Sequence, residues 1–295
     1  KDIRRQEWKA AEIPQQLQKR HVELTGPGNN AKMVINAMNS SADGYMFDLE
    51  DSMSPSFKNV MDAHQNLIDL TRGKLEVTND DKYYSITNKT PPTLFVRARG
   101  LHLFENNVIN SQNTPIQATL FDIGTHLFNN GKALYENGKG PFLYIPKLES
   151  YEDAQYVNNV ITSAEEIIGL PKNSTKVTAL IETYPSIYQT DEIIYAMKDR
   201  ITGLNCGRWD YLFSMIKCLN EKQLFPRREL LTMEQPFMEA YVQQIVNASH
   251  HRGIHAMGGM SAFIPTKNIE ENNKIINNIL NDKTLEISRG CDGAW

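Results

Sequence analysis

The stretch FLYIPKLESYEDAQYVNNVITSAEEIIGLPKNSTKVTALI, residues 142–181, contains one complete unit of the fold that the sequence predicts. It begins with the β-rich run Phe142–Pro146 and ends with a second such run, Thr175–Ile181. Between them, apolar residues recur at helical spacing over Tyr151–Ile168, which is typical of an amphipathic helix. A strand, a helix and another strand in this order indicate two parallel strands joined by a right-handed crossover.

The same alternation extends in both directions along the chain of 295 residues. Further strands are expected at His21–Thr25, Gly44–Leu49, Thr93–Ala98, Ile201–Cys206 and Gly253–Met257, and an eighth begins at Gly293. Further helices are expected at Phe57–Leu70, Ile187–Met197, Phe237–Ala248 and Ile269–Leu280. Eight such strands predict an α/β fold, the (β/α)8 TIM barrel, which commonly occupies about 250 residues. An open doubly wound sheet is disfavoured, because no Gly-x-Gly-x-x-Gly turn follows the first strand.

We expect the barrel to span residues 21–295, after a lead-in segment at 1–20, with its eighth strand truncated at Trp295. The charged, threonine-rich stretch 74–90 predicts an inserted β-hairpin. The net charge of −4 gives no electrostatic reason to expect nucleic acid or a membrane as partner. Three widely spaced cysteines are typical of a reducing compartment, so we expect an intracellular protein. A homo-oligomer is possible, and the sequence leaves this open.

Charged residues gather at the points where the expected strands end. They occur in Asp48–Ser52, Arg97–Gly100, Pro146-Lys147, Glu182-Thr183 and Gly207–Asp210. The strand ends of a barrel meet at one rim, so these side chains are expected to line one pocket. Mg²⁺ takes one or two protein carboxylates and leaves other positions to water and substrate. We expect Glu182 and Asp210 as Mg²⁺ ligands, with Glu50 and Asp51 holding metal-bound water.

Each of these residues also has a purely structural alternative. Asp210 could cap a helix at Tyr211–Leu219, and Arg97 and Arg99 could form salt bridges at the rim. Helix capping does not require charged residues at the same height on five strands, which favours a shared site. The turn Gly207-Arg208-Trp209 runs into a helix start, where backbone N–H groups favour an anion, so a small carboxylate substrate is expected there.

Taken together, the motifs resemble malate synthase, in particular its shorter A-type form. The most specific matches are GLNCGRWDY at 203–211 and HAMGGM at 255–260. Further matches are VELTGP at 22–27, KMVINA at 32–37, EDS at 50–52, RARGLHL at 97–103, PK at 146–147 and LIET at 180–183. The likeness runs in order along essentially the whole chain.

The resemblance implies a Mg²⁺-dependent enzyme that condenses acetyl-CoA with glyoxylate and hydrolyses the thioester to give malate and CoA. It implies the following roles: Glu182 and Asp210 as metal ligands; Arg97 as the catalytic arginine; Arg97, Glu182, Gly207, Arg208, Trp209 and Asp210 around glyoxylate; and Ser52 and Pro265 along the acetyl-CoA channel. Family members work in the cytoplasm or in peroxisome-type organelles such as glyoxysomes.

The family's general base is an aspartate in a helical C-terminal domain, and that domain is absent from this sequence. We therefore expect part of a longer enzyme, whose turnover depends on residues beyond Trp295. One alternative is a barrel that has lost catalysis and only binds acyl-CoA or glyoxylate. Another is an acyl-CoA lyase or thioesterase of the citrate-lyase-β-like group, which lacks the Cys-Gly-Arg-Trp-Asp turn found at 206–210.

Overall fold

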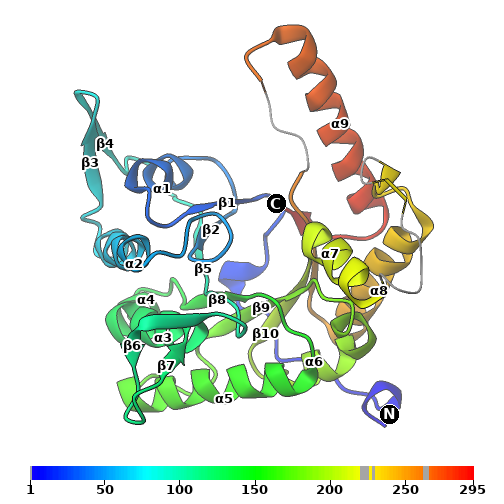
Figure 1. Cartoon of the computed structure of the whole chain (residues 1–295), viewed down its shortest axis with the longest axis horizontal. Coiled ribbons are helices and arrows are strands. Elements are labelled where there is room, and N and C mark those ends of the chain that lie inside the picture. Colours follow the sequence, from blue (N-terminus) through cyan, green and yellow to red (C-terminus); the bar gives the residue numbers. More distant parts are fainter. Residues whose placement is uncertain (1, 220–225, 228–229, 262–265) are drawn as a thin grey trace.

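The computed structural model describes residues 2–219, 226–227, 230–261 and 266–295. Within these ranges, eight parallel strands form one sheet in chain order (Figure 1). Their bounds are β1 Glu23–Pro27, β2 Gly44–Asp48, β5 Thr93–Arg97, β8 Phe142–Ile145, β9 Lys176–Ile181, β10 Ile201–Cys206, β11 His255–Gly258 and β12 Gly293–Ala294. A parallel bridge between Val22 and Ala294 brings the last strand back to the first. This confirms the predicted (β/α)8 barrel, with a short eighth strand.

Two groups of buried side chains stabilise the barrel, because successive residues of a strand point to opposite faces. One group fills the interior and consists of Leu17, Met46, Phe95, Phe142, Tyr144 and Leu180. The larger group lies between the strands and the surrounding helices. Since both faces are covered, the strands are apolar along most of their length, and β2 and β10 are buried at every position.

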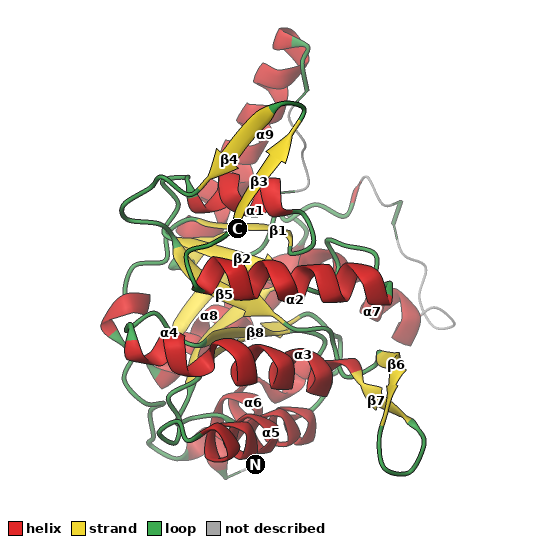
Figure 2. Ribbon diagram, turned by 90° about the vertical axis from the view of Figure 1, so that its left-hand side faces the viewer, coloured by secondary structure: helices red, strands yellow, loops and turns green. Residues whose placement is uncertain are grey.

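The helices surround the strands (Figure 2). Their bounds are α1 Ala31–Met38, α2 Phe57–Thr71, α3 Ala118–His126, α4 Lys132–Glu136, α5 Tyr151–Ile168, α6 Thr190–Ala196, α7 Arg208–Leu219, α8 Pro236–Arg252 and α9 Ile269–Ser288. Shorter helical segments are η1 Ile3–Arg5, η2 Gln15–Leu17, η3 Leu127–Gly131 and η4 Ser186–Gln189. The helix expected at Tyr151–Ile168 is confirmed at both ends, where a capping box of Ser150 and Asp153 opens it and Gly169, with φ of +73°, closes it.

Helices α1, α3 and α4 were not predicted, and α9 continues to Ser288, beyond the expected end at Leu280. Two further helices begin differently from the sequence prediction. The helix expected at Ile187–Met197 is divided between η4 and α6. Its start is altered because Ser186 Oγ donates to the Thr183 carbonyl and accepts from the Thr183 N–H, and such local bonds compete with helix geometry. Helix α7 begins at Arg208, ahead of the expected start at Tyr211, so Asp210 lies in its first turn and does not precede it.

Two antiparallel hairpins extend from the barrel. The expected one is confirmed as β3 Glu76–Asn79 and β4 Lys82–Ser85. The second, β6 Phe104–Ile109 with β7 Pro115–Gln117, follows β5 and was not anticipated. Its strands are polar and largely exposed, so they lack the apolar alternation that marks a half-buried strand.

The N-terminal segment lies at the amino-terminal ends of the barrel strands, because the Ala10 N–H donates to the Arg252 carbonyl before β11 and the Ala11 N–H to the Lys198 carbonyl before β10. Leu17 is buried in the interior cluster, and the Arg252 guanidinium donates to the carbonyls of Gln6 and Arg4. At the other extreme, α9 stands away from the barrel, with Glu286 as its one fully buried residue (Figure 1). Among the described residues, no helix is long and apolar enough to cross a membrane.

Candidate active site

The strand ends bring the predicted residues together at one rim. Glu50 and Asp51 follow β2, Arg97 ends β5, and Glu182 follows β9. Asp210 lies in the first turn of α7. Beside this group is a cavity of about 700 Å³ lined by Lys147, Glu182 and Asp210, together with Leu101, His102, Gln117, Glu149, Asp153, Tyr156, Thr183, Phe213, Ser214 and Lys217. Of the charged strand ends predicted to share one pocket, Lys147, Glu182 and Asp210 line this cavity, and Glu50, Asp51 and Arg97 join them only through ion pairs.

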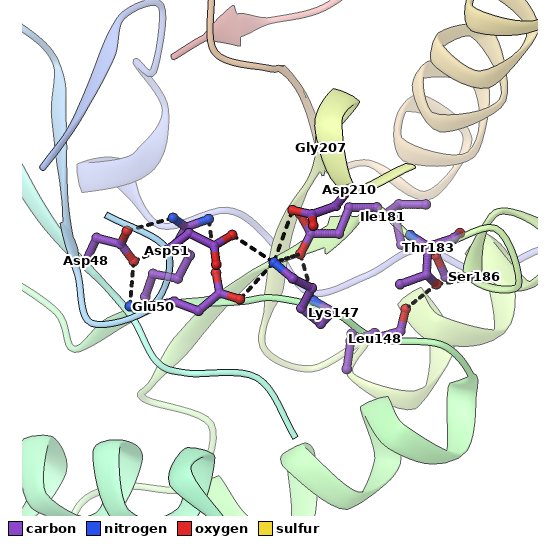
Figure 3. A network of polar contacts seen from close by, with 12 residues as sticks. Asp48, Glu50, Asp51, Lys147, Leu148, Ile181, Thr183, Ser186, Gly207 and Asp210 are labelled. Atoms are coloured by element: carbon purple, nitrogen blue, oxygen red, sulfur yellow. Dashed lines mark hydrogen bonds and ion pairs between the residues drawn. The ribbon is translucent and has the colours of Figure 1, made fainter. Parts of the chain in front are cut away.

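Lys147 lies at the centre of the carboxylates, as Figure 3 shows. Its Nζ is 2.8 Å from Glu50 Oε1, 2.9 Å from Asp51 Oδ2 and 3.0 Å from Asp210 Oδ2. Burial lowers the pKa of Lys147, but the surrounding negative charges outweigh it and hold the pKa well above its ordinary value. Lys147 is thus a charged ammonium in a carboxylate cage, a position that sequence reasoning did not assign to it.

Arg97 is held rigidly by Asp48, the last residue of β2. Its Nε and Nη2 each donate to one Asp48 oxygen at 2.7 Å, and its Nη1 lies 3.3 Å from Glu50 Oε2. Asp48 also accepts the backbone N–H of Glu50 and of Ser52, both at 2.9 Å. Asp48 therefore aligns the arginine and folds the turn that carries Glu50, yet sequence reasoning had not separated it from its acidic neighbours.

Glu182 is fitted between two backbone segments. Its Oε1 accepts the Lys147 N–H at 2.8 Å, and a Cβ built on Gly207 would lie only 2.4 Å from its Oε2. A glycine is therefore required at 207 for the carboxylate to take this place. Burial raises the pKa of Glu182 to about 8, and the charges of Asp210 and Glu50 add to the shift. Burial likewise raises the pKa of Glu50 to about 7.

At the rim, carboxylates outnumber the cations that contact them. In the part of the chain that the structure describes, two cations, Arg97 and Lys147, form ion pairs with five carboxylates: Asp48, Glu50, Asp51, Glu182 and Asp210. Among the described residues, no three Asp, Glu, His or Cys side chains already converge as a metal cage. A cage is not needed for Mg²⁺, since it accepts two carboxylates and keeps water. The excess of oxygen donors over cations therefore fits a divalent ion.

The turn after β10 is fixed by a residue far away in the sequence. The Gly207 N–H donates to the Tyr241 hydroxyl at 2.9 Å, and that hydroxyl donates to the Ile181 carbonyl. Tyr241, from α8, thereby joins the ends of β9 and β10. The Gly207 amide is already engaged in this structure, which leaves the first residues of α7, Arg208 and Trp209, as the part of the turn nearest to the expected anion site.

The remaining predicted residues lie farther from this group. The Arg208 side chain turns toward α9, with Nη1 at 3.5 Å from Asp282. Ser52 is exposed and lines a separate surface pocket with Pro27, Asn30 and Lys32. Pro265 lies outside the described residues. Arg99 forms ion pairs with Asp122 and Glu105 away from the cavity, which agrees with the alternative that it is a salt-bridge partner without a chemical role.

Comparison with known proteins identifies the family. Residues 93–295 match the family model for the malate synthase TIM barrel domain. The chain is 43% identical to malate synthase A of Escherichia coli K12, over 99% of this chain and 55% of that protein. It is 40% identical to the glyoxysomal malate synthase of Candida tropicalis, over 98% of this chain and 53% of that protein. The chain thus spans about half the length of these relatives.

Solved structures agree in fold. The lead(II) complex of Haloferax volcanii malate synthase matches with a TM-score of 0.66 at 15% identity, over 96% of this chain and 70% of that one. The magnesium/glyoxylate complex of the same protein matches with a TM-score of 0.63 at 16% identity, over 94% and 72%. These findings do not favour the citrate-lyase-β-like alternative. With a family model that covers more than half of its residues, the chain belongs to the malate synthase family.

Proposed function

We propose that this chain holds the metal and glyoxylate site of a malate synthase, which condenses acetyl-CoA with glyoxylate and hydrolyses the thioester to malate and CoA. The observation that carries the proposal is the excess of carboxylates around Glu182 and Asp210, beside a buried arginine and an open cavity. The family membership supports the same activity. Because the chain spans about half of its relatives' length, the complete reaction is proposed for a protein that contains this chain.

Glu182 and Asp210 would hold Mg²⁺, with Glu50 and Asp51 placed to orient its water molecules. When bound, Mg²⁺ would polarise the aldehyde of glyoxylate as a Lewis acid. The amides of Arg208 and Trp209 lie at the start of α7, directly after Gly207, where an anionic carboxylate is favoured. The magnesium/glyoxylate complex of the Haloferax volcanii relative supports this choice of metal and ligand.

Arg97 is proposed to stabilise negative charge that develops on the reacting oxygens. A guanidinium has five N–H donors, and the hydrogen bonds to Asp48 use two of them, while Glu50 lies beside Nη1 as an ion-pair partner. Burial lowers the pKa of Arg97, but Asp48 and its neighbours outweigh burial and hold the pKa above the ordinary value. A proton-accepting role is therefore disfavoured, and preorganised electrostatic stabilisation is the role that fits.

Acetyl-CoA is proposed to reach this site along the side of the barrel that carries Ser52, where a cavity of about 570 Å³ is open at the surface. The general base is proposed to come from a helical C-terminal domain of the complete enzyme. The compartment is proposed to be intracellular, either cytoplasm or a peroxisome-type organelle, since glyoxysomal relatives occur in Candida tropicalis and Glycine max.

The test is a chimera in which this chain replaces the matching segment of E. coli malate synthase A. We expect CoA release only when glyoxylate, acetyl-CoA and Mg²⁺ are all present, and little or none from the chain alone. The matched variant Asp210→Asn should lose most of the Mg²⁺ affinity that calorimetry measures on the chain. A folded chimera without turnover, or an Asp210→Asn variant with unchanged metal affinity, would reject the proposal.

A further inference from the structure

Lys147 has no part in the roles proposed above, yet it occupies the centre of the site. An ammonium has three N–H donors. Nζ donates to Asp51 Oδ2 at 2.9 Å and to Asp210 Oδ2 at 3.0 Å, and Glu50 Oε1 forms an ion pair with it at 2.8 Å (Figure 3). A fourth oxygen, Glu182 Oε1, lies at 3.7 Å. The side chain therefore has the surroundings of a bound cation.

The ammonium and a divalent ion cannot share this place. An ion bound to Asp210 and Glu182 at the roughly 2.1 Å typical of Mg²⁺ would lie against Nζ, because Nζ contacts the same two carboxylates. Two positive charges at such a distance repel each other by several kcal/mol, even at the effective dielectric of a protein site. Binding of the metal therefore requires the ammonium to move.

The structure allows this movement without a change in the loop. The Lys147 backbone is fixed by its N–H bond to Glu182, and its φ of +56° sets the direction of the side chain. The four-carbon stem is flexible. It already lines the cavity of about 700 Å³, so the ammonium can turn into that space while the backbone stays in place.

We propose that Lys147 is a positioning residue that holds the carboxylates together without metal, gives way to Mg²⁺, and then directs its charge into the cavity toward an anionic substrate. This inference rests on the proposed function, since it takes Glu182 and Asp210 as the metal ligands. It predicts that one substitution at Lys147 changes metal affinity and carboxylate affinity in opposite directions. Loss of the ammonium should strengthen metal binding and weaken binding of a small carboxylate to the metal-loaded chain.

The experiment compares the wild-type chain with Lys147→Met and with Lys217→Met. Lys217 lines the same cavity but makes none of the described ion pairs with the rim carboxylates, so it controls for a general loss of positive charge. Calorimetric titration with Mg²⁺ alone should give a Kd about tenfold or more lower for Lys147→Met, and an unchanged Kd for Lys217→Met. Titration of the Mg²⁺-saturated chains with glyoxylate should then give a higher Kd for Lys147→Met.

A second measurement uses the wild-type chain and guards against misfolding of the variant. If Mg²⁺ releases the ammonium, amine acylation at Lys147, followed by mass spectrometry, should become several-fold faster when Mg²⁺ is added. Equal or weaker Mg²⁺ binding by folded Lys147→Met, or unchanged acylation, overturns the role of Lys147 and leaves the proposed function intact. Absence of Mg²⁺ binding in all three chains overturns both, whereas binding by Lys147→Met alone supports the inference.

Discussion

The barrel contains two groups of charged side chains, one in its interior and one at its rim, that differ in the ratio of cations to anions. In the interior, Arg20 donates to Glu23 at 2.6 Å, to Thr178 at 2.9 Å and to Tyr144 at 2.7 Å. One cation there meets one anion, and the Trp295 indole N–H adds a further donor 3.1 Å from the Tyr144 hydroxyl. At the rim, five carboxylates meet two cations. In the first group each charge has a partner within the protein, whereas the second holds more carboxylates than cations.

The two groups are neighbours, which makes the contrast informative. Trp295 links them, because its indole contacts the interior group while its ring lies 5.6 Å from the Arg97 guanidinium. Both therefore share one scaffold, and they differ in the ratio of cations to anions. Glu50 and Glu182 at the rim are as buried as Arg20 and Glu23, whereas Asp51 and Asp210 are partly exposed. A buried charge without a partner costs several kcal/mol, so an excess that the fold retains indicates function more strongly than stability.

The largest loss of stability is expected from a substitution in the interior group, where Arg20 and Glu23 balance each other. We expect Glu23→Gln to lower the free energy of unfolding by about 3–5 kcal/mol, because it leaves the buried Arg20 without its counter-charge. The same change at the rim, Glu50→Gln, should cause no such loss in the metal-free chain, because it removes a carboxylate from an excess. Urea denaturation of both variants measures the difference, and equal losses would show that the two groups do not differ in balance.

The sequence predicted those features of the two groups that arise from residues close together in the chain. The barrel follows from apolar periodicity, and the gathering of Glu182, Asp210 and Arg97 follows from the shared direction of parallel strands. Which of two nearby arginines faces the site is not a local property: Arg97 faces Glu50 and Arg99 faces Asp122. Family resemblance, not spacing, supplied that choice.

The supporting residues were missed because their partners are distant in the chain. Lys147 contacts carboxylates from three other segments, and its positive φ has no sequence signal in a lysine. Tyr241 lies 34 residues from Gly207 and looks like any apolar position of an amphipathic helix. These contacts exist only once the barrel has closed, so no sequence window contains them.

A smaller effect on stability is expected from a buried imidazole that is neutral and has no counter-charge. His126 in α3 is fully buried, and burial, with the charge of His64, lowers its pKa to about 3. The unfolded chain, with a His pKa of about 6.5, then binds more protons than the folded chain below that pH. The stability contributed by neutral His126 is complete above about pH 6.5 and is lost as the pH falls toward 3.

At pH 5 this loss amounts to about 2 kcal/mol, since each pH unit is worth about 1.4 kcal/mol. We expect His126→Gln to flatten the dependence of unfolding free energy on pH between 6.5 and 5, whatever its effect at neutral pH. The control His251→Gln, at an exposed position, should keep the wild-type slope. If the slope of His126→Gln equals that of the wild type, burial does not keep His126 unprotonated in the folded chain.

The smallest expected effect tests whether burial of an ion pair, and not merely its presence, determines how much unfolding free energy a substitution removes. Lys58 and Asp62 form an ion pair one turn apart on α2, with side chains 81% and 44% exposed. Solvent screens such a pair, and ordering its long side chains offsets much of the attraction. Asp62→Asn should therefore change the free energy of unfolding by about 0.5 kcal/mol or less, and less still in 0.5 M salt. If Asp62→Asn lost nearly as much unfolding free energy as Glu23→Gln, an exposed ion pair would stabilise the fold as much as an enclosed one. The contrast between the interior and rim groups would then reflect only the number of charged contacts.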